Sequence, residues 1–257
     1  MKPLRAPDVA PGLPPSALFV TGTDTGVGKT VTTAAIGWAL AATGRRVAVL
    51  KPAQTGVEAD QPGDAEFVLA ALGSAQPPAS AVPYRLRAPA APLVAARAEG
   101  MAIDLGRIYD AYAALRASHD VVLVEGAGGL LVPLVEGVSM ADLAAALHLP
   151  LAIAARPSLG TINHTLLTVE AARQRGLDVL GVVFCGWQPT DDLATRTNPA
   201  LVCALGQVRL LGVLPHDPEL SVERLQLGGL RQWATASLAP ALGGRFDAAS
   251  FLASCAP

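Results

Sequence analysis

Glycines and hydroxyl residues surround a single lysine, Lys29, in the segment TGTDTGVGKT (residues 21–30). A glycine-rich loop between a strand and a helix binds phosphate through its backbone N–H groups and the positive end of the helix dipole. Lys29 would add a compact, mobile charge to this loop. The wide, planar fork of an arginine would fit poorly into so narrow a loop. Thr30 would offer its hydroxyl to Mg²⁺. The segment therefore predicts a phosphate-binding site.

Two further motifs carry charged residues that suit the same chemistry. Only three of the 19 basic residues are lysines, and Lys51, in KPAQTG (51–56), is the other one within the body of the chain. Glu125, in VEGAGG, ends an apolar run, a common position for a carboxylate that holds Mg²⁺ beside a phosphate loop. Each has a plainer interpretation, Lys51 as a solvated surface charge and Glu125 as a capping or salt-bridged carboxylate. Asp64, which begins a predicted helix, resembles an N-cap when taken alone.

The elements that must position these residues follow a repeated strand–helix order. Apolar runs rich in β-branched residues alternate with Ala-rich stretches, and the run before Glu125 is apolar on both faces, as in a buried parallel sheet. This alternation predicts an α/β fold: a doubly wound, mostly parallel β-sheet flanked by helices, with ligands at the carboxyl ends of its strands. We predict a proline-rich loop from about residue 74 to 92 and two weak helices in the C-terminal quarter. The predicted strands span residues 17–22, 45–52, 120–129, 150–156, 178–186 and 208–215, and the predicted helices 29–44, 64–73, 104–119, 139–148 and 161–176.

Composition limits the class of protein. The 257 residues are 51% hydrophobic, which allows a sizeable core, and we expect residues 1–16 to be a proline-rich tail and 17–257 one domain. A net charge of −2 without a basic run argues against nucleic-acid binding. No apolar run reaches the roughly 20 residues of a membrane span, and no signal peptide is recognisable. The three scattered cysteines (Cys185, Cys203 and Cys255) suit a reducing cytoplasm, where we expect the protein to reside.

Four motifs together resemble those of the dethiobiotin synthetases, a family of the P-loop NTPase type. GTDTGVGKT, KPAQTG, VEGAGG and LGTINHTLLTVEA occur in the order and spacing of that family, over about residues 17–220. The loop is part of the resemblance. Its first glycine, Gly22, lies one residue earlier than the usual phosphate-loop pattern requires, and the family also has five residues between this glycine and GKT.

The resemblance implies an ATP- and Mg²⁺-dependent ligase of biotin biosynthesis. Such an enzyme carboxylates 7,8-diaminononanoate with CO₂ and closes the cyclic urea of dethiobiotin, through a carbamate and a carbamic-phosphoric anhydride. It would be a homodimer with the substrate site at the interface. The implied catalytic residues are Lys29 and Lys51, and the implied Mg²⁺ ligands are Thr30, Asp64 and Glu125. The implied nucleotide-binding residues are Gly26, Val27, Gly28, Lys29, Thr30, Val31, Asp64, Glu125, Gly126, Ala127, Gly128, Gly186, Trp187, Pro215, His216 and Asp217. The implied substrate-binding residues are Thr25, Lys51, Thr55, Leu159, Gly160 and Asn163.

Two positions depart from the family pattern. Many members have glutamate where this chain has Gly26, so one acidic contact in the loop is missing. Many also place an asparagine that reads adenine at the end of a strand, where this chain has Gly186 followed by Trp187. We therefore expect looser discrimination among nucleoside triphosphates, with backbone groups near Pro215 and His216 helping to hold the base.

Two other classes of protein share parts of this pattern. Partitioning and regulatory ATPases of the ParA/MinD type carry a signature lysine five residues before the loop lysine, where this chain has Asp24. Amide-forming relatives from cobalamin biosynthesis need an additional amidotransferase domain with a nucleophilic cysteine, and no cysteine here lies in such a context. The synthetase interpretation therefore accounts for more of the motifs than either alternative.

Overall fold

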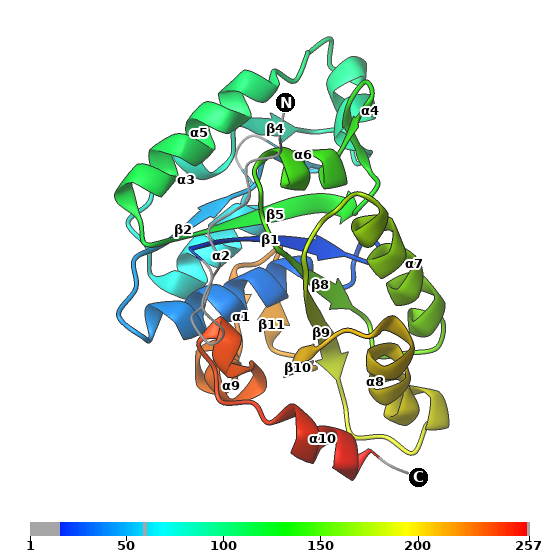
Figure 1. Ribbon diagram of the computed structural model, residues 1–257. Coiled ribbons are helices and arrows are strands. Elements are labelled where there is room, and N and C mark those ends of the chain that lie inside the picture. Colours follow the sequence, from blue (N-terminus) through cyan, green and yellow to red (C-terminus); the bar gives the residue numbers. More distant parts are fainter. Residues whose placement is uncertain (1–15, 59–60, 256–257) are drawn as a thin grey trace.

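Six parallel strands form the centre of the molecule (Figure 1) in the computed structural model, which describes residues 16–58 and 61–255. Their order across the sheet is β10-β9-β8-β1-β5-β2. From β1 the chain passes to the edge strand β2, returns to β5 between the two, and then continues on the other side of β1 through β8, β9 and β10. The order therefore switches beside β1, where such sheets bind ligands at their carboxyl edge. The strands span Ala17–Gly22 (β1), Val47–Leu50 (β2), Val121–Gly129 (β5), Leu151–Ala155 (β8), Val179–Trp187 (β9) and Leu210–Pro215 (β10).

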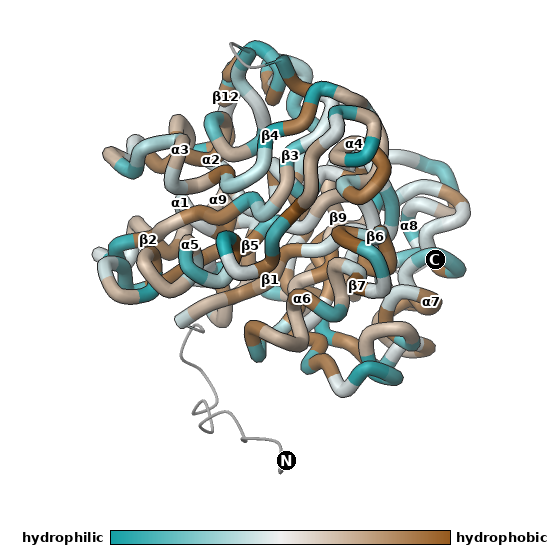
Figure 2. Tube along the Cα trace, turned by 90° about the horizontal axis from the view of Figure 1, so that it is seen from above, coloured by the Kyte–Doolittle hydropathy of each residue, from teal (hydrophilic) through white to brown (hydrophobic). Residues whose placement is uncertain are grey.

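Helices cover both faces of this sheet (Figure 1). The core beneath one face joins Leu18 and Val20 of β1 to α1, α2 and α9, whereas Phe19 points to the opposite face, which α5 and α6 cover. Helices α7 and α8 extend that second layer over β8, β9 and β10. All residues of β1 are buried, and Figure 2 colours most of β1 and β5 as hydrophobic. The covering helices are α1 (Lys29–Ala41), α2 (Asp64–Leu72), α5 (Leu105–Ser118), α6 (Met140–Ala146), α7 (Thr161–Gln174), α8 (Leu193–Gly206) and α9 (Leu230–Ser237).

Shorter elements line the rims of the sheet. Two small hairpins and one parallel strand pair follow the major strands, and none of the helices in the described ranges is long and apolar enough to cross a membrane. The short elements are β3 (Ala53–Thr55), α3 (Pro78–Ala81), β4 (Tyr84–Leu86), α4 (Pro92–Ala98), β6 (Pro133–Val135), β7 (Val138–Ser139), β11 (Leu220–Ser221), β12 (Gln226–Leu227), η1 (Pro240–Leu242) and α10 (Ala248–Ser254).

The predicted fold class is confirmed, and the predicted major elements differ from the structure mainly at their ends. The predicted tail lies, except for Ser16, outside the described residues. Three expectations were wrong. The stretch 74–92 contains α3 and β4 as well as loops, and the N-cap of α2 is Gly63, with Asp64 as the first helical residue. The described part of the C-terminal quarter contains three α-helices, α8 (with Pro199 inside it), α9 and α10, where two weak ones were predicted.

The outer edge of β2 is covered by a side chain instead of another strand. Gln76 is buried, and its amide accepts a hydrogen bond from Val49 N at 2.9 Å and donates one to Val49 O at 2.7 Å. Both backbone groups of Val49 are thereby paired. Buried backbone groups left without partners are costly, so this one side chain stabilises the edge of the sheet.

We expect Gln76→Ala to lower the free energy of unfolding by about 1–3 kcal/mol, because it leaves the N–H and C=O of Val49 unpaired. Urea denaturation of both proteins measures the difference. Gln174→Ala, at an exposed position of α7, is the matched control and should change stability by less than about 0.5 kcal/mol. Equal effects of the two substitutions would contradict the role given to Gln76.

Candidate active site

The loop between β1 and α1 is shaped by glycines with left-handed backbone. Gly26 has φ 72° and Gly28, the N-cap of α1, has φ 88°. A Cβ atom at Gly28 would also lie 2.3 Å from Cys185 Sγ of β9, so the loop can approach that strand only with glycine here. Lys29 folds back over the loop, and its Nζ donates a hydrogen bond to the backbone oxygen of Asp24 at 2.9 Å. The lysine is thus held where a phosphate would replace the carbonyl oxygen as its partner.

A second lysine lies beneath the loop in a buried ionic cluster. Nζ of Lys51 is 2.6 Å from Asp64 Oδ2 and 2.6 Å from Glu125 Oε1, and donates to Gly126 O at 3.2 Å. Three elements meet at this point, because Lys51 follows β2, Glu125 lies in β5 and Asp64 begins α2. The hydroxyl of Thr30, in the first turn of α1, donates to Glu125 Oε1 at 3.0 Å. Oε1 of Glu125 therefore links Lys51 to Thr30, the residue next to Lys29.

The environment fixes the charges of this cluster. Burial alone would lower the pKa of the Lys51 ammonium, but the carboxylates of Asp64 and Glu125 outweigh burial and raise it above its ordinary value. Burial likewise opposes ionisation of Asp64, yet Lys51 holds its pKa below the usual value. Burial raises the pKa of Glu125, and Lys51 offsets part of that increase. Lys51 is therefore a permanent cation paired with two carboxyl groups.

Lys29 is in direct contact with none of the carboxylates in the described ranges, and its pKa moves in the opposite direction. Burial and the neighbouring charge of Lys51 lower the pKa of Lys29 from 10.5 to about 8. An anion bound between the two lysines would relieve this repulsion. The pair is therefore suited to bind a highly charged ligand such as a triphosphate.

A cleft of about 410 Å³ opens over these residues. Its walls come from the phosphate loop, the segment after β2, the start of α2 and the last residues of β5. The turn between β11 and β12 closes another side with Val222 and Glu223, which the sequence analysis did not identify. The predicted site residues that line this cleft are Thr25, Gly26, Gly28, Lys29, Thr30, Val31, Lys51, Thr55, Asp64, Ala127 and Gly128.

Three other predicted residues adjoin the cleft without lining it. Val27 is buried beside the loop, Glu125 lies fully buried beneath it, and Gly126 contributes the carbonyl oxygen that accepts from Lys51. Glu125 Oε2 is buried and has no hydrogen-bond partner among the described residues. A buried carboxylate oxygen without a partner is unusual and suits a bound cation.

The groups around this oxygen are carboxylate and hydroxyl oxygens, the ligand type that Mg²⁺ prefers. The described ranges contain no group of three or more His, Cys, Asp and Glu side chains that could hold a metal. Mg²⁺ does not need one, since it binds through one or two carboxylates together with phosphate oxygens and water. Glu125, with its unpartnered oxygen, Asp64 and the Thr30 hydroxyl fit that pattern.

The residues predicted to surround the nucleotide base form a neighbouring group. Gly186 and Trp187 end β9, and Trp187 O accepts a hydrogen bond from His216 N at 2.7 Å, next to Pro215 of β10. Gly186 follows Cys185, the residue against which Gly28 packs, so this group adjoins the phosphate loop. Asp217 faces elsewhere: its carboxylate accepts hydrogen bonds from Gly229 N and Trp233 Nε1 and organises the C-terminal segment.

The segment before α7 lies outside the cleft. Gly160 is the N-cap of α7, with φ 92°, and both Leu159 and Asn163 are exposed. Leu159 is 83% exposed, an unusual degree for a large apolar side chain. Within the described part of one chain, none of these residues lines the cavity that holds Lys29 and Lys51.

Arg156 is a loop contact that sequence reasoning missed. It follows β8, and its guanidinium nitrogen lies 2.6 Å from Asp24 Oδ2. The backbone N–H of Thr25 and the charge of Arg156 hold the pKa of Asp24 below its ordinary value. Arg156 thereby fixes the residue whose carbonyl oxygen binds Lys29. No local motif marks this arginine. Arg156 and Asp24 are 132 positions apart in the sequence and meet only because they follow adjacent strands.

Two solved structures share the fold of this chain. A ParA family ATPase from Chlorobium tepidum matches with a TM-score of 0.52 at 12% identity, covering 94% of this chain and 99% of the other. The MinD cell division protein of Aquifex aeolicus matches with a TM-score of 0.51 at 17% identity, covering 82% of this chain and 87% of that protein. At such identities the likeness extends to the fold alone.

Sequence relatives identify the family of the chain more specifically than these structures do. An AAA domain model matches residues 16–224. The ATP-dependent dethiobiotin synthetase BioD of Anaeromyxobacter dehalogenans (strain 2CP-C) is 47% identical over 213 residues, which are 83% of this chain and 96% of the relative. The protein of the same name from Streptomyces avermitilis is 42% identical over 94% of this chain and its own full length. The chain belongs to the family of ATP-dependent dethiobiotin synthetases.

Proposed function

We propose that this protein closes the cyclic urea of dethiobiotin on 7,8-diaminononanoate, with CO₂ as the carbon source and ATP as the driving reactant. The observation that carries the proposal is the second buried lysine, Lys51, in the cleft that contains the phosphate loop. A nucleotide-binding switch needs only the loop, whereas joining two anions needs cationic groups between them. The membership of the synthetase family supports the same reaction.

The proposed reaction has three steps. One substrate amine attacks CO₂ and loses a proton, which gives a carbamate. A carbamate oxygen attacks the γ-phosphorus of ATP, and the bond to the β-phosphate oxygen breaks, which releases ADP and leaves a carbamic-phosphoric anhydride. The second amine attacks the carbamate carbon, loses a proton and expels inorganic phosphate. The ring closes with a C–N bond.

Each group of the cleft has a part in bringing these reactants together. Lys29 and the N-terminus of α1 bind the β- and γ-phosphates, and Lys51 lies between the γ-phosphate and the carbamate. Thr25 and Thr55 would bind the amine and carbamate end of the substrate, and their position in the lining of the same cleft supports this role. Glycines at 126 and 128, on either side of Ala127, let the backbone approach the reacting atoms.

We include Mg²⁺ in this proposal, with Thr30, Asp64 and Glu125 as the residues that hold it. The supporting observation is the buried, unpartnered Oε2 of Glu125 beside the Thr30 hydroxyl. When bound, Mg²⁺ neutralises charge on the β- and γ-phosphate oxygens during transfer. Thr30, Asp64 and Glu125 would hold the ion through their side-chain oxygens, next to Lys51.

We also propose that the working form is a homodimer with substrate at the interface. Leu159 and Asn163 are exposed and lie outside the cleft of their own chain. This position supports contact with the cleft of a second subunit. Gly160 and Asn163 at the start of α7 would bind the carboxylate tail of the diamine. The three free cysteines agree with a reducing cytoplasm as the place of action.

Purified protein incubated with 7,8-diaminononanoate, ¹³C-bicarbonate and MgATP tests the function. We expect ¹³C-labelled dethiobiotin and an equal amount of inorganic phosphate, detected by mass spectrometry and a phosphate assay. ATP hydrolysis that does not depend on the diamine, without labelled dethiobiotin, would overturn the proposal.

Lys51→Ala should lower kcat by about 10²–10³-fold, because it removes the cation that stabilises the transferring phosphoryl group. It also leaves Glu125 buried without its partner, at a cost of about 3–5 kcal/mol in stability. The double variant Lys51→Met/Glu125→Gln removes both charges and should recover much of that stability without recovering activity. Denaturation and steady-state assays separate the two effects. A folded, fully active Lys51→Ala protein would contradict the role of Lys51.

The affinity for ATP should depend on the ionisation of Lys29. Because the pKa of Lys29 is lowered to about 8, the cation is present below that pH and is lost as the pH rises through it. The dissociation constant of MgATP should therefore increase as pH rises from 7 to 9.5, by up to about tenfold per pH unit above the pKa. AMP, which lacks the β- and γ-phosphates, is the control and should not show this dependence. A constant MgATP affinity across this range would contradict the assignment.

The enzyme should accept ATP, CTP and GTP with kcat/KM values within about 100-fold of one another, since Gly186 offers no side chain to read the base. Gly186→Asn should increase the preference for ATP. Asparagine tolerates the left-handed backbone of Gly186 (φ 86°), and no atom lies within 4 Å of a Cβ there. Gly186→Ala controls for backbone strain. A strong preference of the unaltered enzyme for ATP would count against this expectation.

A further inference from the structure

A second cavity, of about 610 Å³, lies beside the first half of β2 and shares no lining residue with the catalytic cleft. One wall comes from the ends of α1 and α2, and the opposite wall comes from the end of α5. Ala41 and Leu72 give the first wall an apolar surface, and Ala114 and Leu115 do the same for the second. The cavity therefore has the position that a further strand beside β2 would occupy, between the two helical layers.

The wall formed by β2 carries an unpaired piece of sheet edge. Val49 points its N–H and C=O outward to Gln76, and the N–H of Lys51 binds Ala81 O on the same outer side. Because backbone direction alternates along a strand, the N–H and C=O of Val47 face the same way. Among the described residues, no hydrogen bond to these two groups of Val47 is present on this side. A strand can therefore bond to Val47, but Gln76 stops it from continuing along the edge to Val49.

The described chain begins at Ser16, which is level with Val47 across the sheet. The register pairs Ala17 with Val122 and Val47 with Val121. Ser16 and Val47 therefore lie in one row, on strands that are separated by β5 alone. A position on the outer side of Val47 is three strand spacings from Ser16, or about 14 Å. Fifteen residues precede Ser16, and an extended chain covers this distance in about five of them.

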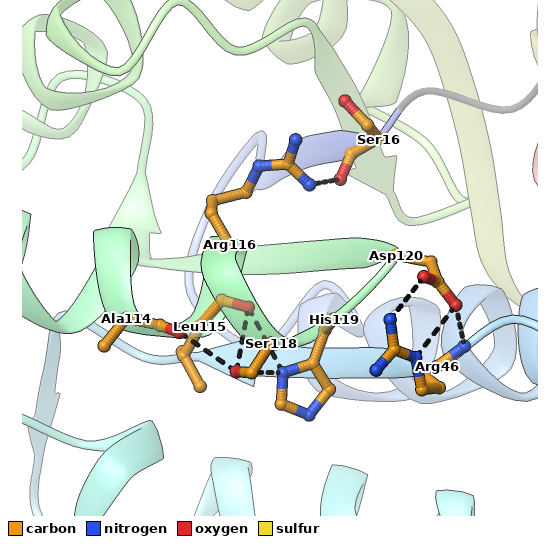
Figure 3. Close-up of polar contacts among 8 residues, drawn as sticks. All are labelled: Ser16, Arg46, Ala114, Leu115, Arg116, Ser118, His119 and Asp120. Atoms are coloured by element: carbon orange, nitrogen blue, oxygen red, sulfur yellow. Dashed lines mark hydrogen bonds and ion pairs between the residues drawn. The ribbon is translucent and has the colours of Figure 1, made fainter.

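Figure 3 shows that Ser16 lies beside the end of α5, the helix that forms one wall of the cavity. Arg116 of this helix donates a hydrogen bond to Ser16 O at 2.8 Å, and Ser118, two residues further on, lines the cavity. Arg46, also in the lining, is paired at 2.9 Å with Asp120, at the start of β5. The described chain therefore begins next to the cavity.

The sequence before Ser16, which lies outside the described ranges, has the proline pattern of an edge strand. In MKPLRAPDVAPGL (residues 1–13), the prolines stand at positions 3, 7 and 11, all of them odd. Alternate residues of an extended chain point their N–H groups to opposite edges, and proline has no N–H. Every even position from 2 to 12 thus keeps its donor on one edge. Proline occurs in sheets in this arrangement, on the open side of an edge strand.

We propose that residues 8–12 of this chain occupy the cavity as a short strand in which Ala10 pairs with Val47. Only six residues separate Ala10 from Ser16, which suffices for the crossing, whereas Gly12 reaches the edge only if every residue between is fully extended. The strand runs antiparallel to β2, because its C-terminal end must lead to Ser16 and Gln76 blocks the other direction. In an antiparallel pair, one residue satisfies both the N–H and the C=O of its partner.

The side chains of this strand suit both walls. Val47 belongs to the core beneath α1 and α2, and paired residues of neighbouring strands point to the same face of a sheet. Ala10 therefore faces the wall that contains Leu72, and Val9 faces the wall of α5 with Ala114. The added strand also covers the remaining part of an exposed sheet edge, which would otherwise be open to pairing with another molecule.

Hydrogen exchange of the Val47 amide, measured by NMR on the full-length chain, tests the proposal. Ala10→Pro removes the donor to Val47 and places a ring against β2, and it should accelerate this exchange by at least about tenfold. Val9→Pro, one residue away on the open edge, is the matched control and should leave the rate unchanged. The amide of Phe19, bonded to Pro150 O in the centre of the sheet, reports an intact fold and should exchange equally in all three proteins.

Cross-strand contacts identify the occupant directly. We expect a nuclear Overhauser effect between Ala10 and Val47 in uniformly labelled protein, and none between differently labelled chains in a mixture of ¹³C- and ¹⁵N-labelled protein. A contact that appears only between chains would assign the strand to a second copy and overturn the proposal. Equal exchange at Val47 in Ala10→Pro and Val9→Pro, or absence of the Ala10–Val47 contact, would also overturn it. The pairing concerns the sheet edge alone, so these outcomes do not depend on the proposed function.

Discussion

Burial of the Lys51 ammonium between two carboxylates constrains where β2, β5 and α2 can lie. An unpaired cation at this depth would be strongly destabilising, so Asp64 and Glu125 must both approach within contact distance. That requirement brings the end of β2, the middle of β5 and the start of α2 to one point. Thr30 adds the phosphate loop to the same point through Glu125. The catalytic edge of the sheet is organised around this cluster.

The cluster is also poised to change. Among the described residues, Glu125 is a buried carboxylate with one oxygen paired and the other without a partner, and the ammonium of the buried Lys29 binds a backbone oxygen. Under the proposed function, both groups would gain partners from a cation and a triphosphate bound in the cleft. Binding would therefore replace protein contacts with ligand contacts, and the binding energy would place Lys51 and Lys29 on either side of the reacting phosphoryl group.

Much of this arrangement was predictable from local sequence, because its main parts are strand ends and a glycine-rich loop. The spacing of Gly22, Gly28 and Lys29 indicated the loop, and apolar runs before Lys51 and Glu125 indicated adjacent parallel strands. What could not be predicted depends on pairing across the chain. Arg156 meets Asp24 only because β8 lies beside β1, and Gln76 completes β2 without any strand motif.

The proposed reaction depends on transfer of a phosphoryl group from ATP to a carbamate oxygen in this cleft. The most direct measurement incubates the enzyme with diamine, MgATP and freshly dissolved ¹⁸O-bicarbonate, and analyses inorganic phosphate by mass spectrometry before the label exchanges with water. If this transfer occurs, the phosphate released with dethiobiotin will carry an ¹⁸O atom from bicarbonate. Formation of dethiobiotin with wholly unlabelled phosphate would contradict it.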